Sequence, residues 1–128
     1  MTRHQLLQIA LFVAGATALS LYPLSVVWPS GWAWHDGPPM ASHYFMMIVG
    51  VYATLGVFQI RAARDPLANR SLIEFSIWSS VVHAAIMAVQ AIDDPMQRGH
   101  LYGDVPALLG GALVLGVLLY GGGRPAQA

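Results

Sequence analysis

The stretch "SLIEFSIWSSVVHAAIMAVQAI", residues 71–92, decides the fold of this chain. Its length matches the roughly 20 residues that cross the hydrocarbon core of a bilayer as a helix. Three further apolar runs of similar length cover approximately residues 6–27, 40–60 and 101–120. The pattern therefore predicts an all-α integral membrane protein with four transmembrane helices.

The composition agrees with a membrane location. Hydrophobic residues make up 56% of the 128-residue chain and charged residues only 9%, against roughly 25% charged residues in soluble domains. The formal net charge is zero and there is no cysteine, which excludes a basic nucleic-acid surface, disulfides and thiolate chemistry. We expect a single domain over residues 1–128, with the lipid bilayer as its surroundings and no nucleic-acid partner.

The arginines predict the orientation of the bundle. They concentrate near the two termini and in the link between the second and third runs, with only Arg98 on the opposite side; these are Arg3, Arg61, Arg64, Arg70 and Arg124. By the positive-inside rule both termini are then cytoplasmic. Short links make successive helices antiparallel, so we expect an up-down-up-down four-helix bundle, in which small residues such as Gly15 and Gly50 allow close helix contact.

A polar stripe runs along the third predicted helix. Its members recur at steps of three and four residues, which places them on one helix face: Ser76, Ser80, His83, Met87, Gln90 and Asp94. Lipid cannot satisfy these groups, so the stripe should face the bundle interior. The second predicted helix offers a matching stripe in His43, Met47, Gly50 and Thr54, and we expect the two stripes to face each other.

Depth separates the polar groups into two candidate sites. At about 1.5 Å per residue, His83 lies near mid-bilayer, roughly 16 Å from Asp94 and 9 Å inward of His43. A second group gathers at the outer membrane face and comprises His35, Asp36, His43, Asp93, Asp94, His100 and Asp104. Imidazole and carboxylate suit divalent metals, and His43, Asp94, His100 and Asp104 are the candidate ligands. Aspartates at helix starts are also common caps, and Asp104 fits an N-cap.

His83 has a structural and a functional interpretation. A hydrogen bond to a serine, to Tyr52 or to a backbone carbonyl would make it a packing residue. Alternatively it is an axial ligand of haem, a hydrogen-bond partner of a quinone or other lipid-soluble ligand, or part of a proton relay through Gln90. Glu74 is simpler, because Ser71 and Glu74 together fit a capping box at the helix start, and Arg70 and Arg61 lie near enough for it to pair with.

Two segments carry a resemblance to known sequences. Residues 50–92, "GVYATLGVFQIRAARDPLANRSLIEFSIWSSVVHAAIMAVQAI", and residues 99–109, "GHLYGDVPALL", resemble a family of small uncharacterised bacterial four-span membrane proteins. In size and span count the chain is also similar to DoxX-like membrane proteins. The resemblance implies a multi-pass protein of the bacterial inner membrane, with the His83 and Gly99–Asp104 regions as family features. It implies no activity.

Three classes of function remain open. The leading hypothesis is a bundle that binds a hydrophobic small molecule or cofactor, such as a lipid, quinone or haem, in an outward-opening pocket. That pocket would be lined by Ser80, His83, Met87, Gln90, His43 and Tyr44, in a homo-oligomer or an accessory subunit of a larger membrane complex. The alternatives are a membrane oxidoreductase or isomerase acting on a lipidic substrate, and a structural scaffold whose polar groups all find protein partners.

Overall fold

The described part of the chain folds into five α-helices and three short 3-10 helices. The computed structural model describes residues 1–32 and 37–122, and these contain no strand. The α-helices are α1 (Arg3–Leu19), α2 (Leu21–Val27), α3 (His43–Ala62), α4 (Arg70–Asp93) and α5 (Asp104–Tyr120), and the 3-10 helices are η1 (Pro29–Trp32), η2 (Pro39–Ala41) and η3 (Pro95–Leu101). The all-helical prediction is confirmed.

Three segments are long and apolar enough to cross a membrane. They are His43–Ala62, Arg70–Asp93 and Pro95–Tyr120, and α1 with α2 makes a fourth if this bent pair counts as one span. The continuous first span predicted over residues 6–27 is corrected, because α1 and α2 meet at a 60° bend. Pro23 explains the break, since its ring clashes with the carbonyl one turn earlier, that of Leu19.

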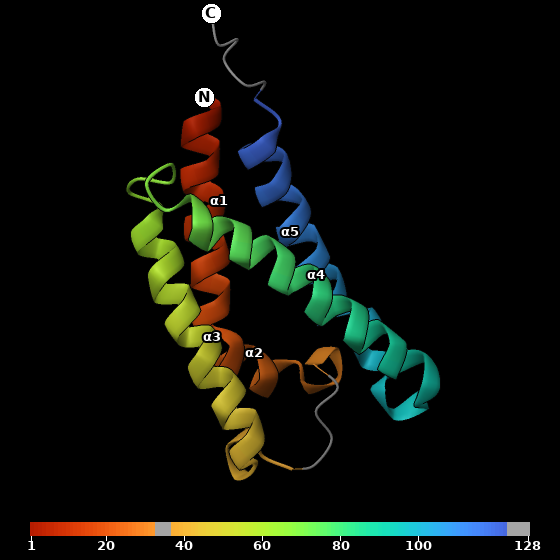
Figure 1. The fold of residues 1–128 in the computed structure, drawn as a ribbon. Coiled ribbons are helices and arrows are strands. Elements are labelled where there is room, and N and C mark those ends of the chain that lie inside the picture. Colours follow the sequence, from red (N-terminus) through yellow and green to blue (C-terminus); the bar gives the residue numbers. More distant parts are fainter. Residues whose placement is uncertain (33–36, 123–128) are drawn as a thin grey trace, which may run out of the picture.

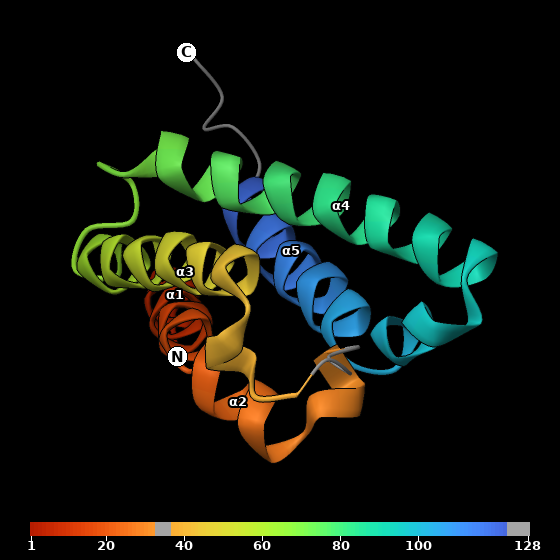
Figure 2. The same cartoon turned by 90° about the horizontal axis from the view of Figure 1, so that it is seen from below.

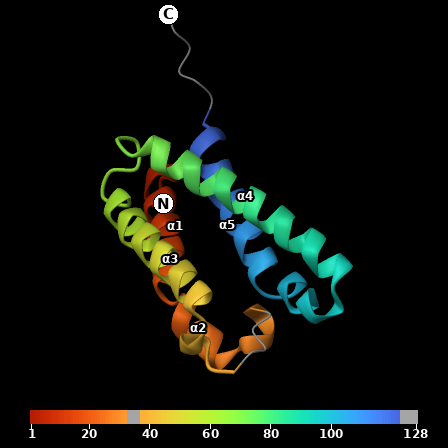
Figure 3. The ribbon, with the colours of Figure 1, turned by 60° about the horizontal axis from the view of Figure 1, so that its bottom comes forward.

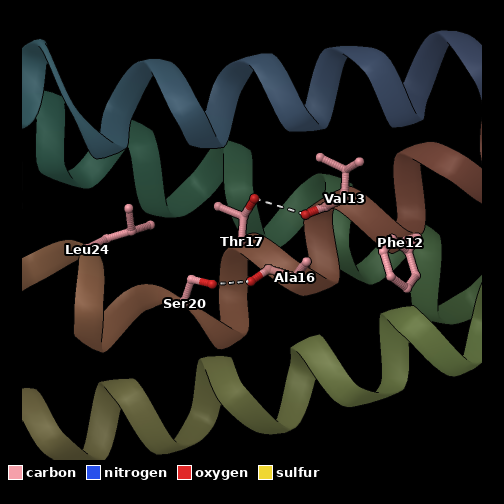
Figure 4. A pocket seen from close by; sticks show the side chains of 6 residues that line it. All are labelled: Phe12, Val13, Ala16, Thr17, Ser20 and Leu24. Atoms are coloured by element: carbon pink, nitrogen blue, oxygen red, sulfur yellow. Dashed lines mark hydrogen bonds between the residues drawn. The ribbon is translucent and has the colours of Figure 1, made fainter.

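The bend leaves a shallow hollow on the surface of α1 and α2. Six residues of these two helices line it, and its volume is about 320 Å³: Phe12, Val13, Ala16, Thr17, Ser20 and Leu24 (Figure 4). The two hydroxyls in it are already paired, because Thr17 donates to the Val13 carbonyl at 2.9 Å and Ser20 to the Ala16 carbonyl at 2.8 Å. The rest of the lining is mainly apolar.

The hydrophobic core lies at one end of the bundle. It comprises the start of α1, the end of α3, the start of α4 and the second half of α5, through Leu7, Leu11, Ala62, Ile73, Ile77, Ala112, Leu115 and Leu119. We call this the closed end; it carries the N-terminus, the α3–α4 turn and the end of α5, at the top of Figure 1. Arg3 ties α1 to α5 there by donating to the Val117 carbonyl at 3.1 Å.

Two helix pairs build the bundle. α1 packs along α3, and α4 packs along α5 and η3. The α1–α3 contact is close because both helices carry glycine where they cross: a Cβ added to Gly15 would lie 2.6 Å from the Gly56 carbonyl oxygen. The prediction for Gly15 is thus confirmed, whereas that for Gly50 is wrong, since nothing lies within 4 Å of a Cβ added there.

α3 and α4 touch only sparsely. Figures 1 and 3 show them close at their shared turn and diverging toward the other end, which we call the open end. Seen from that end, α2 and η1 run along the side opposite α4, from the α1–α3 pair to η3 (Figure 2). Among the neighbouring long helices of the described chain, α3 and α4 thus make the least extensive contact.

Candidate functional site

A tyrosine and a histidine join α3 to α4. The Tyr52 hydroxyl is hydrogen-bonded to His83 Nδ1, and the two ring centroids lie 5.8 Å apart at an interplanar angle of 44°. Both side chains are half-buried. The prediction that His83 faces the interior and pairs with Tyr52, one of the partners considered for it, is confirmed.

A buried hydrogen-bonded pair of side chains lies at the junction of η3 and α5. His100 Nδ1 contacts the two carboxylate oxygens of Asp104 at 2.8 and 2.7 Å, and His100 Nε2 lies 3.1 Å from Gln97 Oε1. Asp104 is only 7% exposed. Asp104 as an N-cap is a wrong prediction, because Gly103 occupies the cap position of α5 without a side-chain cap bond and the Asp104 carboxylate turns to His100.

Asp104 also lies close to the Tyr52–His83 pair. Arg70 stacks over the Tyr120 ring at 5.5 Å, which fixes the register of α4 against α5. Sixteen residues along α4 from Arg70 lead to Ile86, and sixteen residues back along α5 from Tyr120 lead to Asp104. Asp104 is thus level with Ile86, about 4 to 5 Å from His83 along the axis. Asp104 therefore lies at nearly the same level of the bundle as His83.

The prediction that depth separates His83 from Asp94 is confirmed, because one unbroken helix joins them. Asp94 remains about 16 Å from His83 along the unbroken helix α4. Asp104 comes near instead, because η3 turns the chain back along α4 before α5 begins. The four groups Tyr52, His83, His100 and Asp104 form what we call the central polar cluster.

The polar stripe of α4 points inward over most of its length. Ser76 is buried and Ser80, His83 and Met87 are half-buried, whereas Gln90 and Asp94 are exposed. The stripe prediction is thus confirmed from Ser76 to Met87. At its start the predicted capping box is wrong, because α4 begins at Arg70. The expected pairing of Glu74 is confirmed, since its carboxylate accepts from Arg70 Nε at 2.9 Å.

The matching stripe predicted on α3 is wrong. His43, Met47, Gly50 and Thr54 are all exposed, and the Thr54 hydroxyl donates to the Gly50 carbonyl of its own helix at 2.9 Å. The residues that meet α4 are Tyr52 and Gln59. Two helical residues turn the chain by about 200°, so Tyr52 and Thr54 point to nearly opposite sides.

The remaining predicted pocket residues lie apart from His83. His43 is exposed at the start of α3, and the adjacent Tyr44 is 71% exposed. Gln90 lines a polar hollow of about 360 Å³ at the open end, together with Asp93, Asp94 and Gln97. Of the six predicted ligand contacts, Ser80, His83 and Met87 share one inward face.

The four predicted metal ligands are not assembled. Within residues 1–32 and 37–122 no three histidine or acidic side chains come close enough to hold a metal ion. Only His100 and Asp104 meet; His43 is exposed, and the Asp94 carboxylate accepts the Met96 backbone N–H at 2.9 Å as the cap of η3. His35 and Asp36 lie outside the described residues.

A second polar contact between α3 and α4 was not predicted. Gln59, 5% exposed, donates from Nε2 to the Ser76 hydroxyl at 3.2 Å, and Ser76 donates to the Leu72 carbonyl at 2.8 Å. The Gln59 Oε1 atom is buried without a partner among the described residues, as is Trp32 Nε1. The sequence spacing could have predicted this second contact. Gln59 follows Tyr52 by seven residues and His83 follows Ser76 by seven, so each pair shares one face of its helix.

These features define a helical protein with three to four candidate membrane-crossing helices and polar groups enclosed between α3, α4 and α5. The chain belongs to DUF6632, a family of unknown function, whose family model matches residues 1–127. The resemblance to an uncharacterised family is confirmed in this form. No curated protein and no solved structure matches the chain.

Proposed function

We propose that this protein binds a hydrophobic small molecule within its membrane-embedded bundle, with the polar head of the ligand at His83. In this proposal four spans cross the bacterial inner membrane, and the closed end, which carries Arg3, Arg61 and Arg64, faces the cytoplasm. The open end then faces outward. A ligand dissolved in the bilayer would enter where α3 and α4 diverge (Figure 3).

The state of the His83 imidazole supports the proposal most directly. Tyr52 engages Nδ1 and fixes the ring, while Nε2 has no partner among the described residues and is not closed off from its surroundings. An oriented imidazole with one nitrogen available can donate to or accept from a ligand head group. Ser80 and Met87 flank His83 on the same inward face, which gives the mixed lining typical of ligand sites.

The proposal is tested by what the protein retains on purification. We expect wild-type protein in native nanodiscs to carry a lipid-soluble molecule that is detected by its absorption spectrum and by mass spectrometry of the extract. His83→Ala should lose most of it, whereas His4→Ala, the same change at an exposed histidine of α1, should not. Equal content in all three proteins would refute a binding role for His83.

A structural scaffold is the second candidate, because several polar groups do find protein partners. Ser76 and His83 are hydrogen-bonded within the bundle, as a scaffold requires. Two observations count against a scaffold, which requires its polar side chains to be paired: the side chains of Ser80 and Gln90 have no hydrogen-bond partner among the described residues, and Gln59 Oε1 is buried there without one. If His83→Ala lowers stability but leaves bound content unchanged, the scaffold is the correct function.

A further inference from the structure

The hollow at the bend between α1 and α2 opens to the surroundings of the bundle. Its volume is about 320 Å³, and all six residues that line it belong to these two helices (Figure 4). Phe12 and Val13 are each 55% exposed although both side chains are apolar. The hollow therefore presents apolar surface outward.

The polar groups of the hollow are used within α1. Thr17 donates to the Val13 carbonyl and Ser20 donates to the Ala16 carbonyl, so both hydroxyl protons are committed to the backbone. Residues 5–32 include no charged side chain, so this stretch supplies no partner for a charged head group. Because polar groups are costly to bury unless they are hydrogen-bonded, the hollow favours an apolar occupant.

The bend sets the depth of the hollow in the four-span arrangement proposed above. α1 has 17 residues and is about 25 Å long. α2 has 7 residues and is about 10 Å long, and at 60° to α1 it advances about 5 Å along the α1 axis. The bent pair thus advances about 30 Å, the thickness of the hydrocarbon core of a bilayer. Trp28 follows α2 directly and is exposed there, at the interface where tryptophan is enriched.

Along α1 the hollow extends through one leaflet. Phe12 comes nine residues after Arg3, which is about 14 Å along the helix and near the middle of the core. Ser20 comes eight residues later, about 12 Å further toward the open end. The hydrocarbon of one leaflet is about 15 Å thick, half of the core. The length of the hollow thus matches a lipid chain of the leaflet at the open end.

We infer that this hollow holds one acyl chain of a phospholipid from the leaflet at the open end. The chain lies along α1 with its methyl end near Phe12, and the head group lies beyond Leu24. An acyl chain has the length of its leaflet and needs no polar partner, which are the two properties that the hollow requires. The inference rests on the proposed four-span arrangement, but the site is separate from His83, which does not line the hollow.

The test covers the hollow with a larger side chain. Val13→Trp places an indole over it, and the exposure of Val13 keeps that indole out of the core. The matched control is Val82→Trp on α4, where the valine is 57% exposed and lies outside the hollow. Each protein is released from nanodiscs of palmitoyl-oleoyl phosphatidylethanolamine, and the phospholipid that it retains is measured by native mass spectrometry at equal collision energy.

We expect wild-type protein and Val82→Trp to retain one phospholipid. Val13→Trp should retain about tenfold less, because the chain loses many weak contacts with α1 together. Thr17→Val should retain it like wild-type protein, since the Thr17 hydroxyl is already bonded within the helix. His83→Ala should retain it as well, because His83 lies elsewhere in the bundle.

Three results would overturn the inference. Equal retention in Val13→Trp and Val82→Trp would show that no chain occupies the hollow, and loss in Thr17→Val would show that the occupant is polar. A wild-type dimer that dissociates in Val13→Trp would show that a second copy of the chain covers the hollow. If Val13→Trp keeps the phospholipid and His83→Ala loses it, the inference fails while the proposed function is supported.

Discussion

Replacing Gly15 by alanine is expected to push α1 and α3 apart. The new Cβ would lie 2.6 Å from the Gly56 carbonyl oxygen and 2.7 Å from Ile60 Cγ1, well inside the 3.5 to 4.0 Å of favourable contacts. Because one obstacle is backbone, the helices must separate by about 1 Å. Overpacking of this kind costs about 1 to 3 kcal/mol.

The matched control is Gly50→Ala on α3. Nothing lies within 4 Å of the new methyl group there, so only the intrinsic helix preference of alanine over glycine operates, and this stabilises by up to about 1 kcal/mol. The free energy of unfolding of both variants is measured by SDS titration in mixed micelles. Equal stabilities for the two variants would refute the proposed crossing of α1 and α3.

Three further substitutions probe the polar contacts. Asp104→Asn should lower the free energy of unfolding by about 1.5 to 3 kcal/mol because it replaces the charged acceptor of a buried hydrogen bond to His100, whereas Glu74→Gln, at an exposed pair, should cost less than about 1 kcal/mol. Comparable losses would contradict the burial of Asp104. A double-mutant cycle of Tyr52→Phe and His83→Ala should give a coupling of about 0.6 to 2 kcal/mol, and additive effects would argue against their hydrogen bond. Arg3→Ala should cost about 0.3 to 1 kcal/mol, since it removes a cation from the carboxyl end of α5; no change would mean that this contact does not stabilise the closed end.

The helical character and the inward face of α4 could be predicted because both are local. Apolar run length indicates the helices, and the three-and-four spacing of Ser76, Ser80, His83 and Met87 places them on one face. The bend between α1 and α2 was missed although Pro23 signals it, because the apolar run continues past the proline.

The partners of His83 depend on how separate segments meet. On α3 the spacing of His43, Met47 and Thr54 looked as regular as that of Tyr52 and Gln59, and only the packing of α1 against Gly56 turns the second set toward α4. The depth of Asp104 depends on η3, whose seven residues return the chain along α4. A sequence pattern predicts which residues share the inward face of a helix. It does not predict how deep in the bundle the next helix begins.

The central claim is that His83 is held by Tyr52 at Nδ1 and meets its ligand at Nε2. The chain has five histidines, so the ¹⁵N resonances of each imidazole can be assigned by single substitutions. When the retained lipid-soluble molecule is removed from the purified protein by delipidation, we predict a shift of the His83 Nε2 resonance, and the same shift in His4→Ala. A spectrum in which His83 Nε2 does not respond, or in which only His43 shifts, would contradict the account.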